Sequence, residues 1–246
     1  FFSQGLAITD EESAAMQQRG VQIETVPVVA VHGDQPTWLE VELADGRRIA
    51  QRALFVPATQ AMATPLVQQL GCALAESPLG VLIEVDAMKQ TSVPNVYAAG
   101  DAAQKGPPLT PVSSHDGKVV AANLLEGNRH TPDYRGVPSV AFTVPPIAAV
   151  GLSEDEARQQ GLKFQTKSQK ASDWFTARQA AEKTYGFKVM VEDDTGRILG
   201  AHLVGPHADE VINLFALAIR HDLTADNLKT TMFAYPTGAS DIGYML

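Results

Sequence analysis

The chain has 246 residues, of which 45% are hydrophobic and 19% are charged, and its formal net charge is −9. This composition is typical of a globular protein that buries a core, and the length allows one large domain or two of ordinary size. The acidic balance argues against a nucleic-acid surface, which needs clustered Lys and Arg. No apolar run is long enough for a membrane span, so we expect no membrane partner.

The sequence contains a single cysteine, Cys72. One thiol excludes an internal disulfide and a C-x-x-C redox pair within this chain. A small buried side chain is the simplest interpretation of this residue. The lack of disulfides fits a reducing compartment, so we expect a cytoplasmic protein.

The first predicted element is a helix that begins after Thr9. The letters T-D-E-E form a capping box, in which Thr9 caps the helix and Glu12 reaches back, and Gly20 ends it. Four strand-like segments follow: VQIETV, VVAVH, WLEVEL and RIAQRALFV. The last two flank A-D-G, a signal for a tight hairpin. This β-rich segment is expected to close at Pro57.

The next segments lead into a strand that ends in a glycine and an acid. We expect a short helix over 63–71, a strand over 81–88 and a second strand over 96–99. Gly100 has no Cβ, so a ligand could lie against its backbone. Asp101 would follow a strand end, where a carboxylate can accept hydrogen bonds from sugar or polyol hydroxyls. Local pattern alone favours the simpler alternative, in which Asp101 caps a turn.

A long helix is predicted after the polar loop. Thr110 stands at the expected N-cap, Pro111 at the first helical position and Gly127 just past the end. The free N–H groups at its start would point to the same crevice as Asp101 and favour an acceptor or an anion. The alternative is that this helix only packs. The polar segment 128–139 is the best linker candidate.

Beyond the linker, the pattern changes to short strands and capped helices. VAFTV and IAAVG are predicted strands, and a helix follows between a cap at Ser153 and a stop at Gly161. KVMVED and ILGAHLVG form a second pair of strands, followed by the amphipathic helix DEVINLFALAIRHDL and a helix capped by Thr224. This order predicts an α+β domain with helices on one face of an antiparallel sheet.

The segment TSVPNVYAAGDAA, residues 91–103, resembles the second flavin-binding motif of the FAD-dependent pyridine nucleotide–disulfide oxidoreductases. The resemblance implies that Gly100 lies beside FAD and that Asp101 hydrogen-bonds a ribityl hydroxyl. PLTPV is similar to the family segment whose helix N-terminus faces the flavin pyrimidine ring. It implies that Leu109 and Thr110 are neighbouring contacts, and that the helix dipole stabilises negative charge on reduced flavin.

Residues 136–246 resemble the dimerisation domain of the glutathione reductase, mercuric reductase and dihydrolipoamide dehydrogenase group. The opening segment is similar to the end of an NAD(P)H-binding domain in the thioredoxin-reductase-like branch. The resemblance therefore implies three parts: 1–57 from the NAD(P)H-binding domain, 58–130 from the FAD-binding domain, and 136–246 for dimerisation as a homodimer. The expected fold class is α/β followed by an α+β domain.

The glycine-rich loops and the redox cysteine pair of that family are not found in this sequence. The chain therefore looks like the C-terminal half of a flavoenzyme, and we expect it to lack activity alone. The full enzyme would pass a hydride from NAD(P)H to FAD and electrons to a disulfide or another small acceptor. The alternative is a non-catalytic dimerisation or scaffolding module that kept the fold.

The tail departs from the family pattern. The glutathione reductase group carries H-P-T-x-x-E there, but Tyr235 takes the place of the His in this chain. Ser240 stands where the Glu would be, and Asp241 lies one position later. A tyrosine has a reference pKa of about 10 and is a poor base near neutral pH. Tyr235 could donate a hydrogen bond to an oxyanion or a substrate, or could be only an interface aromatic.

Two other groups of residues invite a functional interpretation. His202, His207 and His221 have no metal-ligand spacing with a thiol or a carboxylate, so no metal site is expected. The aromatic pair and the arginine in WFTAR, residues 174–178, could form a substrate lip, but ordinary packing explains them as well.

Overall fold

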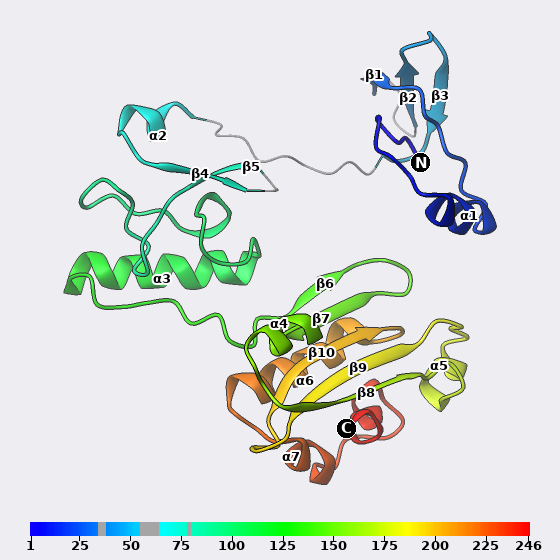
Figure 1. Ribbon diagram of the computed structural model, residues 1–246, viewed down its shortest axis with the longest axis vertical. Helices are drawn as coiled ribbons and strands as arrows, with labels where there is room; N and C mark the ends of the chain where they lie inside the picture. Colours follow the sequence, from blue (N-terminus) through cyan, green and yellow to red (C-terminus); the bar gives the residue numbers. More distant parts are fainter. Residues whose placement is uncertain (34–37, 55–63, 78–79) are drawn as a thin grey trace. The chain divides into compact units, whose positions relative to one another are not determined.

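The computed structural model describes residues 1–33, 38–54, 64–77 and 80–246. The chain forms two compact units, residues 1–59 and 60–246, which Figure 1 shows in blue and in cyan to red. The predicted end of the first segment at Pro57 lies outside the described residues. Among the helices of the described residues, none has both the length and the apolarity to cross a bilayer.

The first unit combines the capped helix α1 (Asp10–Gln18) with a three-stranded antiparallel sheet. The predicted capping box is confirmed, because Thr9 accepts from the Glu12 N–H and Glu12 accepts from the Thr9 N–H at 2.9 Å. The sheet has the order β1-β2-β3. Its strands are β1 (Val28–His32), β2 (Leu39–Leu43) and β3 (Arg48–Gln51). Val41 and Leu43 are buried on one face.

Two strand predictions in this unit were wrong or too long. Residues 21–26 form only an isolated bridge, Phe2 with Glu24, because their partner is the very short N-terminal segment. The last predicted strand stops at Gln51, and residues 55–56 lie outside the described part.

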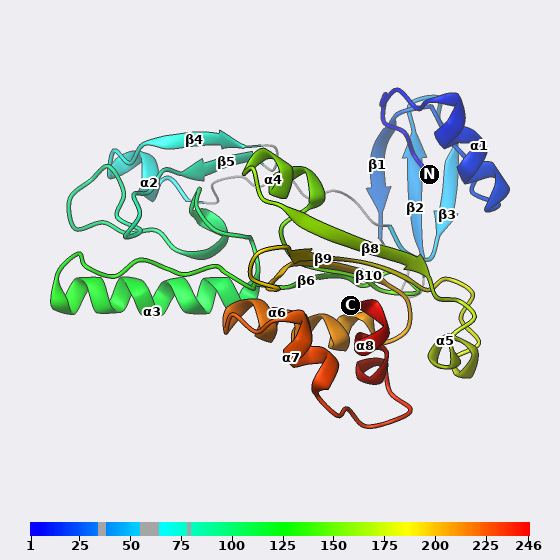
Figure 2. The same cartoon turned by 60° about the horizontal axis from the view of Figure 1, so that its bottom comes forward.

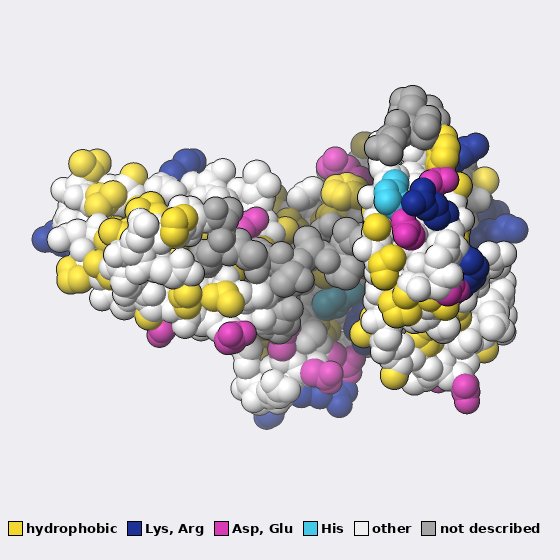
Figure 3. Space-filling view, turned by 90° about the horizontal axis from the view of Figure 1, so that it is seen from above, with side chains coloured by type: hydrophobic (Ala, Val, Ile, Leu, Met, Phe, Trp, Pro, Cys, Tyr) yellow, Lys and Arg dark blue, Asp and Glu magenta, His cyan; other side chains and the backbone are white. Residues whose placement is uncertain are grey.

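Charges of both signs are interspersed on this sheet. Glu42 pairs with His32 at 2.6 Å and with Arg48 at 3.1 Å. Figure 3 shows a histidine, basic side chains and acidic side chains next to one another on the visible face. These pairs lie at the protein surface and are expected to contribute little to stability.

The second unit begins with short elements around a long helix. β4 pairs with β5 as an antiparallel hairpin, and a small apolar cluster forms beneath it, with Cys72 partly buried against the cluster. The elements are α2 (Leu66–Gln69), β4 (Leu74–Ser77), β5 (Gly80–Ile83), the 3₁₀ turn η1 (Gly100–Ala102) and α3 (Thr110–Glu126).

The predicted strand at 96–99 is not formed. This segment is extended, but it makes only one antiparallel bridge, between Gln90 and Tyr97, so it lacks the repeated ladder of a strand. Similarly, the strand expected over 81–88 ends at Ile83. Asp101 therefore follows an extended segment and sits in a 3₁₀ turn.

Residues beyond the linker form a five-stranded antiparallel sheet in the order β6-β7-β10-β9-β8. The strands are β6 (Ser139–Ala141), β7 (Ile147–Gly151), β8 (Phe164–Lys170), β9 (Gly186–Glu192) and β10 (Ile198–Val204). The α+β prediction is confirmed. No sequence pattern predicts β8, because this edge strand, FQTKSQK, is almost entirely polar and exposed.

Helices cover this sheet mainly on one face. Figures 1 and 2 show α6, α7 and α8 on one side of the sheet and the short α4 on the other. The helices are α4 (Glu154–Gln159), α5 (Phe175–Gln179), α6 (Ala208–Arg220), α7 (Ala225–Thr230), the 3₁₀ turn η2 (Gly238–Asp241) and α8 (Ile242–Met245). The predicted caps Ser153 and Thr224 are both present.

The core of this domain lies between α6 and strands β7, β9 and β10. Val211, Ile212 and Phe215 project from one stripe of α6 and are almost fully buried. Such burial contributes roughly 1.5–3 kcal/mol for each large apolar side chain. The amphipathic pattern read from the sequence thus places the helix correctly.

Replacing Phe215 by Ala should lower the free energy of unfolding of this unit by about 3–5 kcal/mol, because the ring is fully buried and leaves a cavity. Leu217→Ala, two residues later on the exposed side of α6, is the matched control and should change it by less than about 0.5 kcal/mol. Urea unfolding followed by Trp174 fluorescence in a Trp38→Phe background measures both. Equal losses would contradict this account of the core.

Candidate functional site

The turn at Gly100 is packed directly against helix α3. Gly100 has φ +64°, and a Cβ there would lie 2.3 Å from the Ser113 hydroxyl oxygen. Any larger residue would therefore collide with α3 and strain the backbone. The sequence suggested that the missing Cβ lets a ligand approach the backbone. In the structure it makes room for helix α3 instead. Contact of Gly100 with a cofactor stays a prediction.

The Asp101 side chain is exposed at the tip of this turn. Its carboxylate makes no hydrogen bond or ion pair with any residue that the structure describes. The turn has no side-chain cap, so Asp101 does not cap it as the simpler alternative predicted. The carboxylate remains available to accept hydrogen bonds from hydroxyl groups of a ligand.

Helix α3 begins without a capping side chain. Leu109 is the N-cap with extended backbone, so the prediction of Thr110 as the cap was wrong by one residue. Pro111 is therefore the second helical residue, one position later than predicted, and Gly127 ends the helix with φ 82°. Because no side chain accepts from the first-turn N–H groups, the positive end of a 17-residue helix is open to an acceptor. Thr110 is exposed there, and Leu109 is half-buried.

A buried polar cluster lies behind the turn. Asp116, on the inner face of α3, is fully buried and accepts three hydrogen bonds or ion-pair contacts. The Gly100 N–H lies 3.2 Å from Oδ2, Lys89 Nζ lies 2.7 Å from the same oxygen, and the Tyr134 hydroxyl donates to Oδ1 at 2.7 Å. The carboxylate therefore joins three segments that are far apart in the sequence.

Lys89 neutralises this carboxylate inside the protein. Its side chain is also fully buried, and it donates to the Lys105 carbonyl oxygen as well as to Asp116. Its ammonium lies 5.3 Å from the centroid of the Tyr134 ring, a distance at which a cation–π attraction adds to the contact. Burial and the Asp116 carboxylate together raise the pKa of Tyr134 well above its ordinary value.

One sequence pattern, which belongs to none of the motifs above, indicates this cluster. The buried residues of α3 are Val112, Asp116, Val119 and Asn123, which follow one another at spacings of four, three and four. A charged and an amide residue on the buried stripe of a helix indicate polar groups with specific partners. Lys89 carried no comparable signal, because its partner is distant in sequence.

In the tail, the structure does not bring Tyr235 together with an acid. Tyr235 is 75% exposed, and its ring centroid lies 6.1 Å from that of Phe175. The buried Asp241 accepts instead from the Tyr185 hydroxyl at 2.9 Å. Ser240 closes a local turn by donating to the Thr237 carbonyl oxygen at 2.6 Å. Neither residue can therefore act as the acid of a Tyr235 pair in this arrangement.

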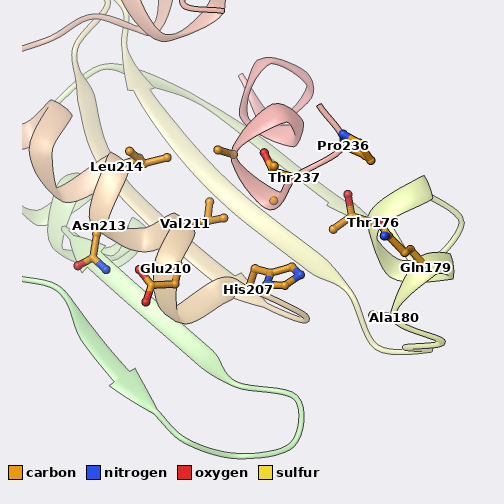
Figure 4. Close-up of a pocket in the computed structure, with 12 residues that line it drawn as sticks. Thr176, Gln179, Ala180, His207, Glu210, Val211, Asn213, Leu214, Pro236 and Thr237 are labelled. Carbon is orange, nitrogen blue, oxygen red and sulfur yellow. The ribbon is translucent and has the colours of Figure 1, made fainter. Parts of the chain in front are cut away.

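A surface pocket of about 680 Å³ lies beside the tail. Figure 4 shows how α5, the start of α6 and the tail contribute Thr176, His207, Glu210 and Thr237 to its walls. Pro236 follows Tyr235 into this lining. The pocket therefore has both hydrogen-bonding groups and apolar surface, as small-molecule and interface pockets commonly do.

Two of the remaining candidates, Trp174 and His202, make contacts within the protein. Trp174 packs edge-on against Tyr185 and Tyr244, so ordinary packing explains this residue. His202 contacts the Leu152 carbonyl oxygen at 3.1 Å. Among the described residues, no group of three or more His, Cys, Asp or Glu side chains could hold a metal ion.

The two buried tyrosines should make stability fall at alkaline pH. The pKa values of Tyr134 and Tyr185 are raised, chiefly by burial, and each hydroxyl bonds an aspartate. Because an unfolded tyrosine titrates near pH 10, the unfolded state loses protons first above that pH, and the free energy of unfolding should decrease there. Urea unfolding between pH 8 and about 11 measures this slope. Tyr134→Phe and Tyr185→Phe should each reduce the slope, and an unchanged slope in the double variant would contradict the assignment.

Two parts of the chain match sequence models of the same protein family. Residues 4–117 match the sequence model described as pyridine nucleotide-disulphide oxidoreductase, and residues 137–245 match the dimerisation domain of the same family. The chain is 51% identical over 160 residues to an uncharacterised 19.7 kDa protein in a mercuric resistance operon of Staphylococcus aureus. This match covers 65% of the chain and 89% of that protein.

Longer relatives match over part of their length. The dihydrolipoyl dehydrogenase of Staphylococcus aureus is 33% identical over 244 residues, which are 94% of this chain and 49% of that enzyme. The HOCl-induced flavoprotein disulfide reductase RclA from Escherichia coli has a TM-score of 0.70 at 26% identity, covering 96% of this chain and 54% of that one. The chain thus spans about half the length of these two proteins.

These matches confirm the resemblance seen in the sequence and the expected fold class. The family consists of FAD- and NAD(P)H-dependent oxidoreductases, so the use of flavin and pyridine nucleotide holds for the family in general. The chain belongs to the pyridine nucleotide-disulphide oxidoreductase family.

Proposed function

We propose that the chain is the C-terminal part of an FAD- and NAD(P)H-dependent oxidoreductase related to the disulfide reductases. The observation that carries the proposal is the pairing of two open groups in one small region. The Asp101 carboxylate has no partner among the described residues, and the nearby helix α3 begins without a cap. In a protein of this family, such groups are suited to a cofactor with hydroxyls and an electron-accepting ring.

The residues present fit a flavin at this place. Asp101 would accept hydrogen bonds from ribityl hydroxyls, and Gly100, Leu109 and Thr110 would lie beside the cofactor. The open N–H groups of α3 would stabilise negative charge on the pyrimidine side of the ring. FAD bound there would supply the transfer of electrons from NAD(P)H to an acceptor.

The three parts implied by the resemblance form the proposed organisation. Residues 1–57 would be the end of the NAD(P)H-binding domain and 58–130 the second half of the FAD-binding domain. Residues 136–246 would form a homodimer, which is supported by the match of 137–245 to the dimerisation domain. The remaining cofactor-binding groups would come from polypeptide outside this chain, so this chain alone should lack activity.

Tyr235 is the proposed contact with the electron acceptor. Its hydroxyl is exposed, has no partner among the described residues, and lies next to the lining of the tail pocket. It would donate a hydrogen bond to a disulfide or another small acceptor at the partner subunit. The engagement of Asp241 with Tyr185 argues against the acid–base pair of the glutathione reductase group.

The alternative function, a non-catalytic dimerisation or scaffolding module, is favoured by the same tail. A module that had lost its chemistry would need the α+β domain but would have no use for the open Asp101 carboxylate. Flavin binding and self-association therefore separate the two functions.

The first test is the affinity of the chain for FAD. Asp101→Ala should weaken FAD binding by about tenfold or more, because a carboxylate that accepts charge-assisted hydrogen bonds is lost. Fluorescence titration and flavin absorbance after desalting measure the binding. Glu126→Ala, an exposed acid at the far end of α3, is the control and should leave the affinity unchanged. Equal affinity of wild type and Asp101→Ala would refute the ribityl contact.

The second test is the mass of the chain in solution. Sedimentation equilibrium should give twice the mass of one chain, and the segment 137–245 expressed alone should give a dimer as well. A monomer at all concentrations would refute the homodimer. A dimer that retains no flavin would favour the scaffolding module.

A further inference from the structure

We propose that Asp116 is a positioning residue that fixes the Asp101 turn for flavin binding; the proposal rests on the proposed function. Its carboxylate holds the Gly100 N–H at 3.2 Å, one residue before the proposed ribityl ligand. A carboxylate that holds the Gly100 amide restricts where the Asp101 side chain points, since the two residues are adjacent in the chain.

The turn needs such support because its local contacts are sparse. η1 consists of three residues, and it has no capping side chain. Gly100 also adopts a positive φ that an unsupported chain visits only as one of several conformations. A hydrogen bond to a buried, immobile carboxylate on α3 selects one of these conformations. The same helix presents the open N–H groups, so Asp116 fixes both proposed flavin contacts relative to each other.

Lys89 makes the burial of this carboxylate possible. Both side chains of the pair are at most 1% exposed, and their charged atoms are 2.7 Å apart. A buried carboxylate without a cation would be strongly destabilising. Lys89 also bonds the Lys105 carbonyl oxygen, so the loop that connects η1 to α3 is anchored to the same pair.

Tyr134 ties the cluster to the domain that follows. Its hydroxyl bonds Asp116, and its neighbours are held by α6: Arg220 donates to the Asp133 carbonyl oxygen at 3.0 Å. Gly136 packs so closely on α6 that a Cβ would lie 2.7 Å from the Ala216 carbonyl oxygen. The contacts of residues 133 and 136 with α6 therefore hold Tyr134 in place, and the Tyr134 hydroxyl in turn limits the movement of Asp116.

The test compares two variants that differ only at position 116. Lys89→Met/Asp116→Asn/Tyr134→Phe removes the charges and the tyrosine hydroxyl but keeps one side-chain oxygen for Gly100. Lys89→Met/Asp116→Leu/Tyr134→Phe removes that oxygen as well. Both lack an unpaired buried charge, and apolar replacement of a buried ion pair is often tolerated.

Amide hydrogen exchange and FAD titration are measured on both variants. The Gly100 amide should exchange about tenfold faster in the Leu variant than in the Asn variant, and FAD should bind about tenfold more weakly, as expected for one lost hydrogen bond. Amides in the middle of α3 are the internal control and should exchange equally. A role confined to general stability would change these amides too and would overturn the proposal.

Other outcomes also decide the proposal. Equal Gly100 exchange in the two variants, or faster exchange with unchanged FAD affinity, would overturn the positioning role. If the Leu variant does not fold, the wild-type chain still provides a test, because a Gly100 amide that exchanges at the unprotected rate would refute the contact. If this chain alone does not bind FAD, the two variants are compared in the chain joined to the polypeptide that supplies the remaining cofactor-binding groups. Failure of that longer protein to bind FAD would overturn the proposed function, and the exchange data alone would then decide whether Asp116 holds the turn.

Discussion

The buried pair of Asp116 and Lys89 is the constraint on which the proposed flavin-binding region depends. Neither charge could stay in the interior alone, since breaking such a pair costs about 3–5 kcal/mol. Once paired, the carboxylate still accepts from Gly100 and Tyr134. The exposed Asp101 directly follows the Gly100 amide that this carboxylate holds.

Helix α3 extends the same principle along its length. Asn123, also buried on its inner face, bonds the Met88 and His130 carbonyl oxygens at 3.0 and 2.8 Å. Through Asp116 and Asn123 the helix therefore contacts the loops at Met88 and Gly100 and the segment from His130 to Tyr134. In the dimerisation domain the opposite holds, because the apolar stripe of α6 on the sheet supplies most of the burial.

The polar residues of the tail make contacts within the domain. Asp241 is buried against Tyr185 and stabilises the C-terminal turn, and Ser240 closes that turn locally. Tyr235 is left exposed beside a pocket, with Phe175 as its aromatic neighbour. A hydrogen-bond donor at this place is compatible with acceptor binding, whereas a base of the usual kind would need a partner acid.

The sequence by itself determined the features that depend on neighbouring residues. The sequence predicts the helix caps at Thr9, Ser153 and Thr224 correctly, because an N-cap needs only one side chain and the backbone three positions on. Tertiary structure alone decided the contacts of Asp116, the polar edge strand β8 and the failure of 96–99 to become a strand. These features depend on partners distant in the chain, and no local pattern encodes which partner will be present.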